Sequence, residues 1–315
     1  MIRCLSHFLT RNTFLSIALL LVFSTFSCDS QRNDDVMENR NSAVESPNLN
    51  ISDEYKIGGF AVGTQAYTFN RFSVFEAIEK TAQAGGKIIE LYPGQSFTPD
   101  DDTPLHSITD RQIDELLAKL EEHEIRLVNY GVAGMPDAET AREVFEFAEK
   151  LGVPAVTSNP NTHEEMDFIE PLVQEFDIMM AIHNHPRPED EDSDYMIWDP
   201  NHVADLLEGR DPRMGISGDT GHWVRTGISP VEALRISEGR IISLHLKDVD
   251  RQDREGEDVI FGTGLGEVAE VLEELKRQNF AGHISVEYES NWYHNVPDVA
   301  QNIGFIRGWA ERDAQ

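Results

Sequence analysis

The sequence predicts a single α/β domain, a (β/α)8 TIM barrel, over residues 56–312. Along this range, short apolar runs alternate with amphipathic segments, which indicates parallel strands joined by helices. Eight such units in roughly 250 residues match the usual size of a (β/α)8 barrel. Polar clusters also follow the apolar runs in the second half of the range, as expected where strand ends open onto the functional face of a barrel.

The elements follow from hydrophobic periodicity. The expected strands are the apolar runs 58–66, 87–92, 125–131, 154–158, 176–183, 213–218, 241–247 and 283–289. The clearest expected helices carry apolar residues at helical spacing, and several end at Gly. These helices cover 72–85, 110–123, 137–152 and 266–278. An acidic loop, 186–199, follows the fifth expected strand, and it is either a lid over the barrel mouth or a solvated insertion.

The first 55 residues are expected to lie outside the barrel. Residues 1–27 contain arginines followed by a short apolar run, the pattern of a secretory signal peptide. The run ends at Cys28 in a sequence that resembles a bacterial lipobox, so we expect lipid attachment at Cys28 and a membrane anchor. Residues 28–55 are polar and predict a disordered tether. The expected location is therefore the periplasm or cell surface of a bacterium.

Charge and cysteine content exclude several functions. Lys and Arg number 26 against 57 Asp and Glu, which gives a formal net charge of −31. Such a charge repels phosphate backbones and argues against a nucleic-acid partner. The two cysteines are Cys4, in the expected signal peptide, and Cys28, so neither a disulfide nor a thiolate metal site is expected in the mature domain.

Four polar side chains at the ends of the last four expected strands predict a divalent-metal site. They are His183, Asp219, His245 and Glu287. The ends of parallel barrel strands converge on one mouth, and an imidazole inside the apolar run of His245 is costly without a partner. A capping role for Asp219 is not expected, because the next helical segment begins only near Ser229. Mixed imidazole and carboxylate ligands favour Mn²⁺, Co²⁺, Zn²⁺ or Fe²⁺ and leave the choice among them open.

Other polar and aromatic residues near strand ends are candidates for catalysis or substrate binding. His185 lies two residues after His183, so both side chains point to the same side of the strand and either could be the metal ligand. Glu90, inside an apolar run, is expected to bind hydroxyls or to act as a base. Lys247 is expected to bind substrate or to pair with Asp248 or another carboxylate. Further candidates are Gln65 as a substrate contact and Trp223, Trp292 and Tyr293 as stacking faces for a sugar ring.

Six short runs resemble the sugar phosphate isomerase/epimerase family, which has a xylose isomerase-like barrel and includes inosose dehydratases and ketose 3-epimerases. They are LYPGQ (91–95), HNHP (183–186), SGDTGHW (217–223), LHLKDVD (244–250), FGTGLGE (261–267) and ISVEYESNW (284–292). The resemblance spans residues 58–309. It implies one divalent metal held by His183, Asp219, His245 and Glu287, with His222 in contact with the substrate beside the metal.

One run departs from the family pattern. The epimerases carry a Glu on the fifth strand that binds metal and moves a proton, whereas this chain has His183-Asn184-His185. Glu287 remains as one base, and His185 or Glu90 would have to supply the other. Such a site could still remove a proton beside a metal-polarised carbonyl, because the metal stabilises the enediolate that forms.

Three functions are compatible with this pattern. Return of the proton elsewhere makes the protein an isomerase or epimerase, the function that we expect. Loss of a β-substituent makes it a keto-sugar lyase or dehydratase, and carbohydrate binding without turnover is the third alternative. Because the signal peptide directs export, and sugar phosphates are cytosolic, a non-phosphorylated sugar such as a keto-sugar or glycoside is the expected substrate.

Overall fold

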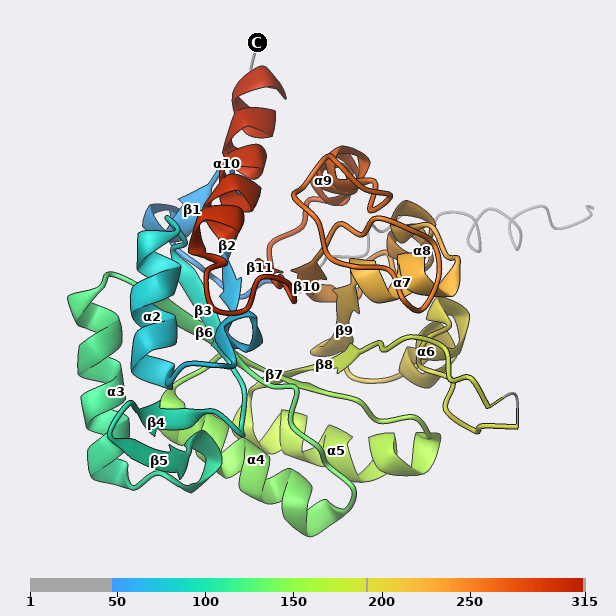
Figure 1. Cartoon of the computed structure of the whole chain (residues 1–315). Helices are drawn as coiled ribbons and strands as arrows, with labels where there is room; N and C mark the ends of the chain where they lie inside the picture. Colours follow the sequence, from blue (N-terminus) through green and yellow to red (C-terminus); the bar gives the residue numbers. More distant parts are fainter. Residues whose placement is uncertain (1–46, 191, 314–315) are drawn as a thin grey trace, which may run out of the picture. The chain divides into compact units, whose positions relative to one another are not determined.

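The computed structural model describes residues 47–190 and 192–313 (Figure 1). The expected signal peptide, the lipidation site at Cys28 and most of the expected tether lie outside these residues. Of the helices within them, none has the length and apolar character needed to cross a membrane.

Eight parallel strands close into a barrel, as predicted. In chain order they are β2 (Phe60–Gln65), β3 (Ile88–Leu91), β6 (Arg126–Tyr130), β7 (Ala155–Ser158), β8 (Met179–His183), β9 (Met214–Asp219), β10 (Ile241–Leu246) and β11 (His283–Val286). Each strand pairs with the next, and parallel pairing of β11 with β2 closes the ring. The chain also forms β1 (Lys56–Ile57), antiparallel to β2, and an unpredicted hairpin of β4 (Ser96–Thr98) and β5 (Asp101–Pro104).

Helices surround the barrel (Figure 1). The four amphipathic stretches form α2 (Val74–Gln83), α3 (Asp110–Glu122), α4 (Ala138–Leu151) and α9 (Val268–Arg277). The others are α5 (His163–Phe176), α6 (Pro200–Leu207), α7 (Thr220–Thr226), α8 (Pro230–Ile236) and α10 (Val296–Asp313), with short 3-10 turns η1 (Asp53–Tyr55), η2 (Ala66–Phe69) and η3 (Leu105–Ser107). Capping boxes at Ser73, Thr109 and Thr162 start α2, α3 and α5.

The apolar core has two layers. The larger one fills the space between strands and helices and includes Ile182 and Leu244. Because side chains alternate along a strand, the neighbours His183 and His245 point into the barrel instead. The smaller layer lies inside the barrel near the strand starts and consists of Ala61, Ile88, Val128, Ala155, Ala181 and Ile242 together with Leu49 and Ile51. Polar side chains are therefore gathered at the opposite, carboxyl end of the strands.

The folded domain begins before the boundary expected near residue 56. Leu49 and Ile51 are only 4% and 6% exposed and pack on the inner layer. The Leu49 backbone N–H donates to the Ala281 carbonyl at 3.3 Å. The expectation of a disordered tether up to residue 55 is wrong for residues 47–55, because two apolar side chains in a polar stretch are enough to cover the open end of a barrel.

Candidate metal centre

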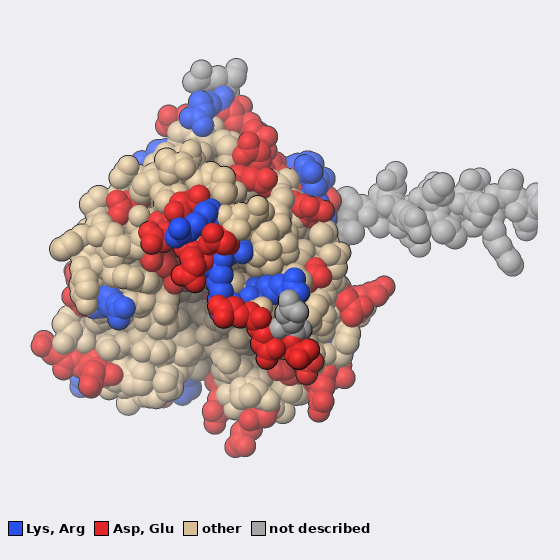
Figure 2. Space-filling model, turned by 45° about the vertical axis from the view of Figure 1, so that its right-hand side comes forward, with Lys and Arg blue, Asp and Glu red and all other residues tan. Residues whose placement is uncertain are grey.

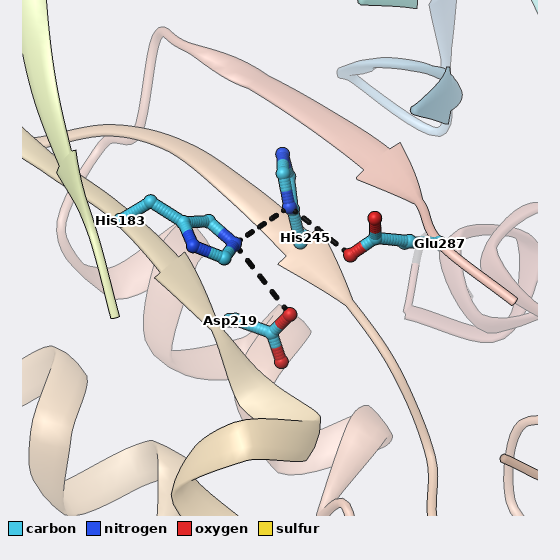
Figure 3. A group of neighbouring side chains, drawn as sticks. All are labelled: His183, Asp219, His245 and Glu287. Carbon is cyan, nitrogen blue, oxygen red and sulfur yellow. Dashed lines mark hydrogen bonds and ion pairs between the residues drawn. The ribbon is translucent and has the colours of Figure 1, made fainter. Parts of the chain in front are cut away.

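Four side chains meet where β8, β9, β10 and β11 end (Figure 3). They are the predicted metal ligands His183, Asp219, His245 and Glu287, and all four are buried. His245 pairs with Asp219 across β10 and β9, and Glu287 directly follows β11, so strand register brings the side chains to one level. One ligand atom from each residue lies within 4.8 Å of the others.

The donor atoms face one another. His183 Nε2 lies 2.9 Å from His245 Nδ1 and 3.6 Å from Asp219 Oδ2, and Glu287 Oε2 lies 3.2 Å from His245 Nδ1 (Figure 3). Burial alone would lower the pKa of His245, but Glu90 and Glu287 outweigh burial and raise it well above its usual range. The positive charge that the carboxylates stabilise on this ring could equally come from a cation. The residues present therefore fit one divalent metal with two nitrogen and two oxygen ligands.

Glu90 lies behind His245 and does not line the cavity. Its Oε2 is 3.0 Å from His245 Nε2 and accepts a hydrogen bond from Ser285 Oγ at 3.1 Å. Both Glu90 and His245 are buried. A carboxylate on the outer nitrogen of a ligating imidazole orients the ring and increases its basicity. The geometry thus places Glu90 where it can position a metal ligand, and neither of the roles expected from the sequence, binding of substrate hydroxyls or action as a base, fits its position outside the cavity lining.

Lys247 is buried beneath the same carboxylates. Its Nζ lies 2.8 Å from Glu287 Oε2 and 3.0 Å from Asp219 Oδ2, and it also pairs with Glu289. The side chain is fully enclosed, so direct contact with a substrate in the cavity does not fit this structure. Of the two predicted roles, ion pairing with carboxylates is the one that the geometry matches.

Asp248, the pairing partner first considered for Lys247, has a different role. Its carboxylate accepts the backbone N–H groups of Gly262, Gly264 and Gly266 at 2.8, 2.9 and 2.7 Å. The two runs LHLKDVD and FGTGLGE therefore meet through one carboxylate, which holds the glycine-rich loop after β10. This loop contributes no lining residue to the cavity next to His183 and Glu287.

Asp219 also caps a helix, which contradicts the expectation from sequence. Its Oδ1 accepts the His222 backbone N–H at 2.8 Å and starts α7 directly after β9. The short α7 was not expected because its sequence has weak helical propensity, and tertiary packing overrides that propensity. Gly221 makes this packing possible, since a Cβ there would come within 2.8 Å of Lys247 Cβ. The other carboxylate oxygen of Asp219 remains directed at His183.

A cavity of about 410 Å³ opens over the metal ligands. It is lined by Gln65, Tyr67, Tyr92, Val132, His183, His185, His222, Glu287 and Glu289. Gln65, His185 and His222 were predicted from sequence, whereas Tyr67, Tyr92, Val132 and Glu289 were not. The signal that could have identified Glu289 is its position two residues after Glu287, which places both carboxylates on the same side of an extended segment.

His185 projects into this cavity and is held by the loop 186–199. Its Nδ1 lies 2.8 Å from the Tyr195 hydroxyl. Burial, and next the neighbouring His183, lower the pKa of His185 to about 3, so its imidazole is neutral at pH 7. Asn161 fixes the loop on both sides of Tyr195, donating to the Asp194 carbonyl at 2.7 Å and accepting from the Met196 N–H at 2.6 Å. The part of the loop that carries Tyr195 is thus fastened at the site.

The two predicted stacking indoles lie in different environments. Trp223 is fully buried against Gly218, where a Cβ would come within 2.4 Å of the indole. The prediction that Trp223 stacks on a sugar is therefore wrong, because its position in the short helix α7 turns the ring into the core. Trp292 is half-buried at the mouth, and its ring lies 6.1 Å from that of Tyr67.

Comparison with known proteins agrees with this architecture. Residues 78–309 match the family described as xylose isomerase-like TIM barrel. A crystal structure of an uncharacterized protein from Parabacteroides distasonis ATCC 8503 is 32% identical, with 79% of this chain and 99% of that chain covered and a TM-score of 0.64. A D-tagatose 3-epimerase-like protein is 20% identical, with 80% and 97% covered and a TM-score of 0.64. The IOLI protein, whose crystal structure holds a zinc atom, is 14% identical, with 80% and 98% covered and a TM-score of 0.62. No curated protein matches the sequence.

Proposed function

The chain belongs to the xylose isomerase-like TIM barrel family, and from that premise we propose that it is a metal-dependent isomerase or epimerase of a non-phosphorylated sugar. The observation that carries the proposal is the cluster of His183, Asp219, His245 and Glu287 at the cavity. A divalent cation held by these side chains would polarise a sugar carbonyl and make the neighbouring C–H more acidic. The similarity to a D-tagatose 3-epimerase-like protein supports a reaction of this class.

Two residues that line the cavity outside the ligand cluster, Glu289 and His185, are placed to act on the substrate. Lys247 lowers the pKa of Glu289, but burial and Glu287 outweigh it, so the pKa is raised and this carboxylate is the stronger base. Burial would raise the pKa of Glu287, but Lys247 and His245 dominate and lower it, which makes Glu287 a poor base. We therefore assign proton abstraction to Glu289 and a hydrogen bond to the substrate oxygen to the neutral His185.

The charges around the cavity favour a neutral substrate. Among the described residues, the cavity lining contains two carboxylates, Glu287 and Glu289, and neither Lys nor Arg. Lys247 is already shared by three carboxylates. Figure 2 shows a face on which acidic side chains outnumber the Lys and Arg among them. On the loop after β8, Asp190 is exposed, whereas Glu189 pairs with Arg254 at 3.4 Å. The described lining therefore offers a phosphate group no cationic side chain to bind, which supports a non-phosphorylated sugar.

Elimination from a keto-sugar is the second candidate. The observation that favours it is the pair of His183, the last residue of β8, and His185, two residues later, where a two-base epimerase would have a carboxylate. Within the described part of the chain, Glu289 is the one carboxylate in the cavity lining that is not a metal ligand. No second carboxylate in the described lining could therefore return the proton to the opposite face of the sugar. Loss of a β-substituent needs one base and a hydrogen-bond donor for the leaving group, which Glu289 and His185 could supply.

NMR in D₂O separates these reactions. The protein loaded with Zn²⁺ or Mn²⁺ would be incubated with ketoses and keto-sugars. Deuterium at the carbon beside the carbonyl, with the skeleton intact, supports isomerisation or epimerisation, and an unsaturated product supports elimination. His245→Ala is the control that should abolish metal binding and exchange together. If no sugar reacts with either metal, the enzyme proposal fails, and a carbohydrate-binding protein without turnover becomes the better account.

We also propose that the protein is exported and anchored through a lipid on Cys28, where it would face the periplasm or the cell surface. The pattern of residues 1–28 supports this proposal. Metabolic labelling with an alkyne fatty acid in a bacterial host would test it. Label in the wild type and none in Cys28→Ser is the expected result, whereas an unlabelled wild-type protein in the cytosolic fraction would contradict the anchor and remove one argument for a non-phosphorylated sugar.

A further inference from the structure

We propose that the cavity extends into a subsite for a second ring, formed by Tyr92, Tyr67 and Trp292. The substrate is then a glycoside with two linked rings, of which the reacting ring carries the keto group, rather than a free monosaccharide. The proposal rests on the proposed function in one respect: the reacting sugar lies at the cluster of His183 and its partner ligands. The second ring, either a pyranose or an aryl group, would lie against the aromatic side chains.

The three aromatic rings form a continuous run. The Tyr67 ring lies 5.3 Å from that of Tyr92 at 71° and 6.1 Å from that of Trp292 at 88°, both in edge-to-face arrangement. These residues follow β3, β2 and β11, which are neighbours in the barrel, so the rings occupy one side of its mouth. Tyr67 and Tyr92 also line the cavity. The run therefore begins at the cavity wall and leads outward to Trp292.

The two ends of this cavity differ in chemistry. The inner end presents imidazoles and carboxylates, which suit the oxygen atoms of a reacting sugar. The outer end presents aromatic rings, and such surfaces pack against the C–H faces of a sugar or against an aryl ring. Small-molecule sites usually combine an apolar wall with a few polar groups that fix the orientation of the ligand. A free monosaccharide in the cavity would leave Trp292, which does not line it, without a contact.

Tyr67 is exposed, and Tyr92 and Trp292 are half-buried. The exposed large apolar side chains in the described part of the chain are Tyr67 (41%), Leu117, Leu265 and Tyr293. Tyr67 is thus an exposed aromatic ring that is also part of the cavity wall. Arg71 lies over the Trp292 ring at 5.7 Å and, together with Tyr67, fixes the indole in place. A rigid and partly exposed aromatic wall is preorganised for a ring-shaped ligand.

Paired ligands that differ only in the second ring test this proposal. Binding of methyl and phenyl glycosides of glucose, galactose, mannose and xylose to the Zn²⁺-loaded full protein would be measured by calorimetry, with cellobiose and lactose as disaccharide probes. We expect at least one phenyl glycoside to bind about fivefold to tenfold more tightly than its methyl partner, as stacking on one or two rings would give. A matching gain for a disaccharide would identify a pyranose as an accepted second ring, and a gain for phenyl alone would identify an aryl group.

Variants show whether the preference arises at the proposed wall. Tyr67→Ala and Trp292→Ala should each reduce the phenyl-to-methyl affinity ratio to below about twofold. Tyr293→Ala is the matched control. Its exposed ring packs on Phe72 and does not line the cavity, so the stacking role expected for it from the sequence does not fit the structure. Thermal unfolding would verify that each variant folds. Equal affinities within every pair, including no detectable binding, or a preference that survives both wall variants, would overturn the subsite.

The binding assay does not depend on turnover, so the two proposals can fail separately. A phenyl preference in a protein that produces no exchange in D₂O would keep the subsite and reject the reaction. Turnover of free monosaccharides without any ring preference would keep the reaction and reject the subsite.

Discussion

The contact between Glu90 and His245 gives the sharpest prediction about metal binding. Its Oε2 and Nε2 atoms lie 3.0 Å apart, and both residues are buried, so salt hardly screens the interaction. Removing a carboxylate from the outer nitrogen of a ligating imidazole typically weakens metal affinity about 10- to 100-fold, or about 1.4–2.7 kcal/mol. Glu90→Gln keeps an oxygen acceptor and loses only the charge, so we expect the zinc affinity to fall about tenfold. Glu90→Ala loses both the charge and the acceptor, so we expect the zinc affinity to fall about 100-fold.

Competition against a fluorescent zinc chelator at pH 7.5 would measure these affinities. Ser285→Ala is the matched control, since it removes the other hydrogen bond to the same Oε2 atom and leaves His245 untouched. We expect this control to change zinc affinity less than threefold, a small effect next to that of removing the charge. Wild-type affinity in both Glu90 variants would show that Glu90 does not position His245.

Three further predictions concern stability and protonation. Lys247→Met leaves Asp219, Glu287 and Glu289 without their buried cation. In urea titrations of the metal-free protein, the unfolding free energy should therefore fall by about 3–5 kcal/mol and recover partly when Zn²⁺ is added. A loss below about 1 kcal/mol would contradict the ion-pair account. The pKa of His245 is raised in the metal-free fold, so its contribution to stability is complete below the unfolded value of 6.5 and disappears as pH rises through the folded pKa. The same proton competes with the cation, so metal binding should release a proton and weaken as pH falls, which calorimetry in buffers of different ionisation heat would detect. Leu49→Ala should lower the unfolding free energy by about 2–4 kcal/mol. Glu54→Ala, at an exposed position of the same segment, should leave it nearly unchanged, and equal values for the two variants would show that this segment does not stabilise the barrel.

The strands and the four ligand residues could be predicted because each ligand follows or ends an apolar run. Hydrophobic periodicity locates strand ends, and barrel topology then brings those ends together, as the register of His245 with Asp219 shows. The surroundings of the ligands could not be predicted in the same way. Lys247 and Glu289 are 42 positions apart in the chain, and only the folded barrel shows that they pair.

The direction in which a side chain points was the other property that the sequence did not predict. Trp223 and Trp292 both follow strands and look equivalent in the sequence, yet one ring is buried against Gly218 and the other is at the mouth. The difference arises because Asp219 starts a helix at once, which rotates the following residues toward the core. Glu90 was placed correctly at a strand end, but its contact with His245 depends on a residue 155 positions away.

Leu49 and Ile51 have a practical consequence for how the molecule can be held. They enter the barrel at the strand starts, whereas the cavity opens at the strand ends. A group attached at residue 47 is therefore joined to the barrel at the end opposite the cavity opening. An affinity tag, a solid support or a membrane attached there would keep the entrance unobstructed, so bulky molecules could approach it from the surrounding solution.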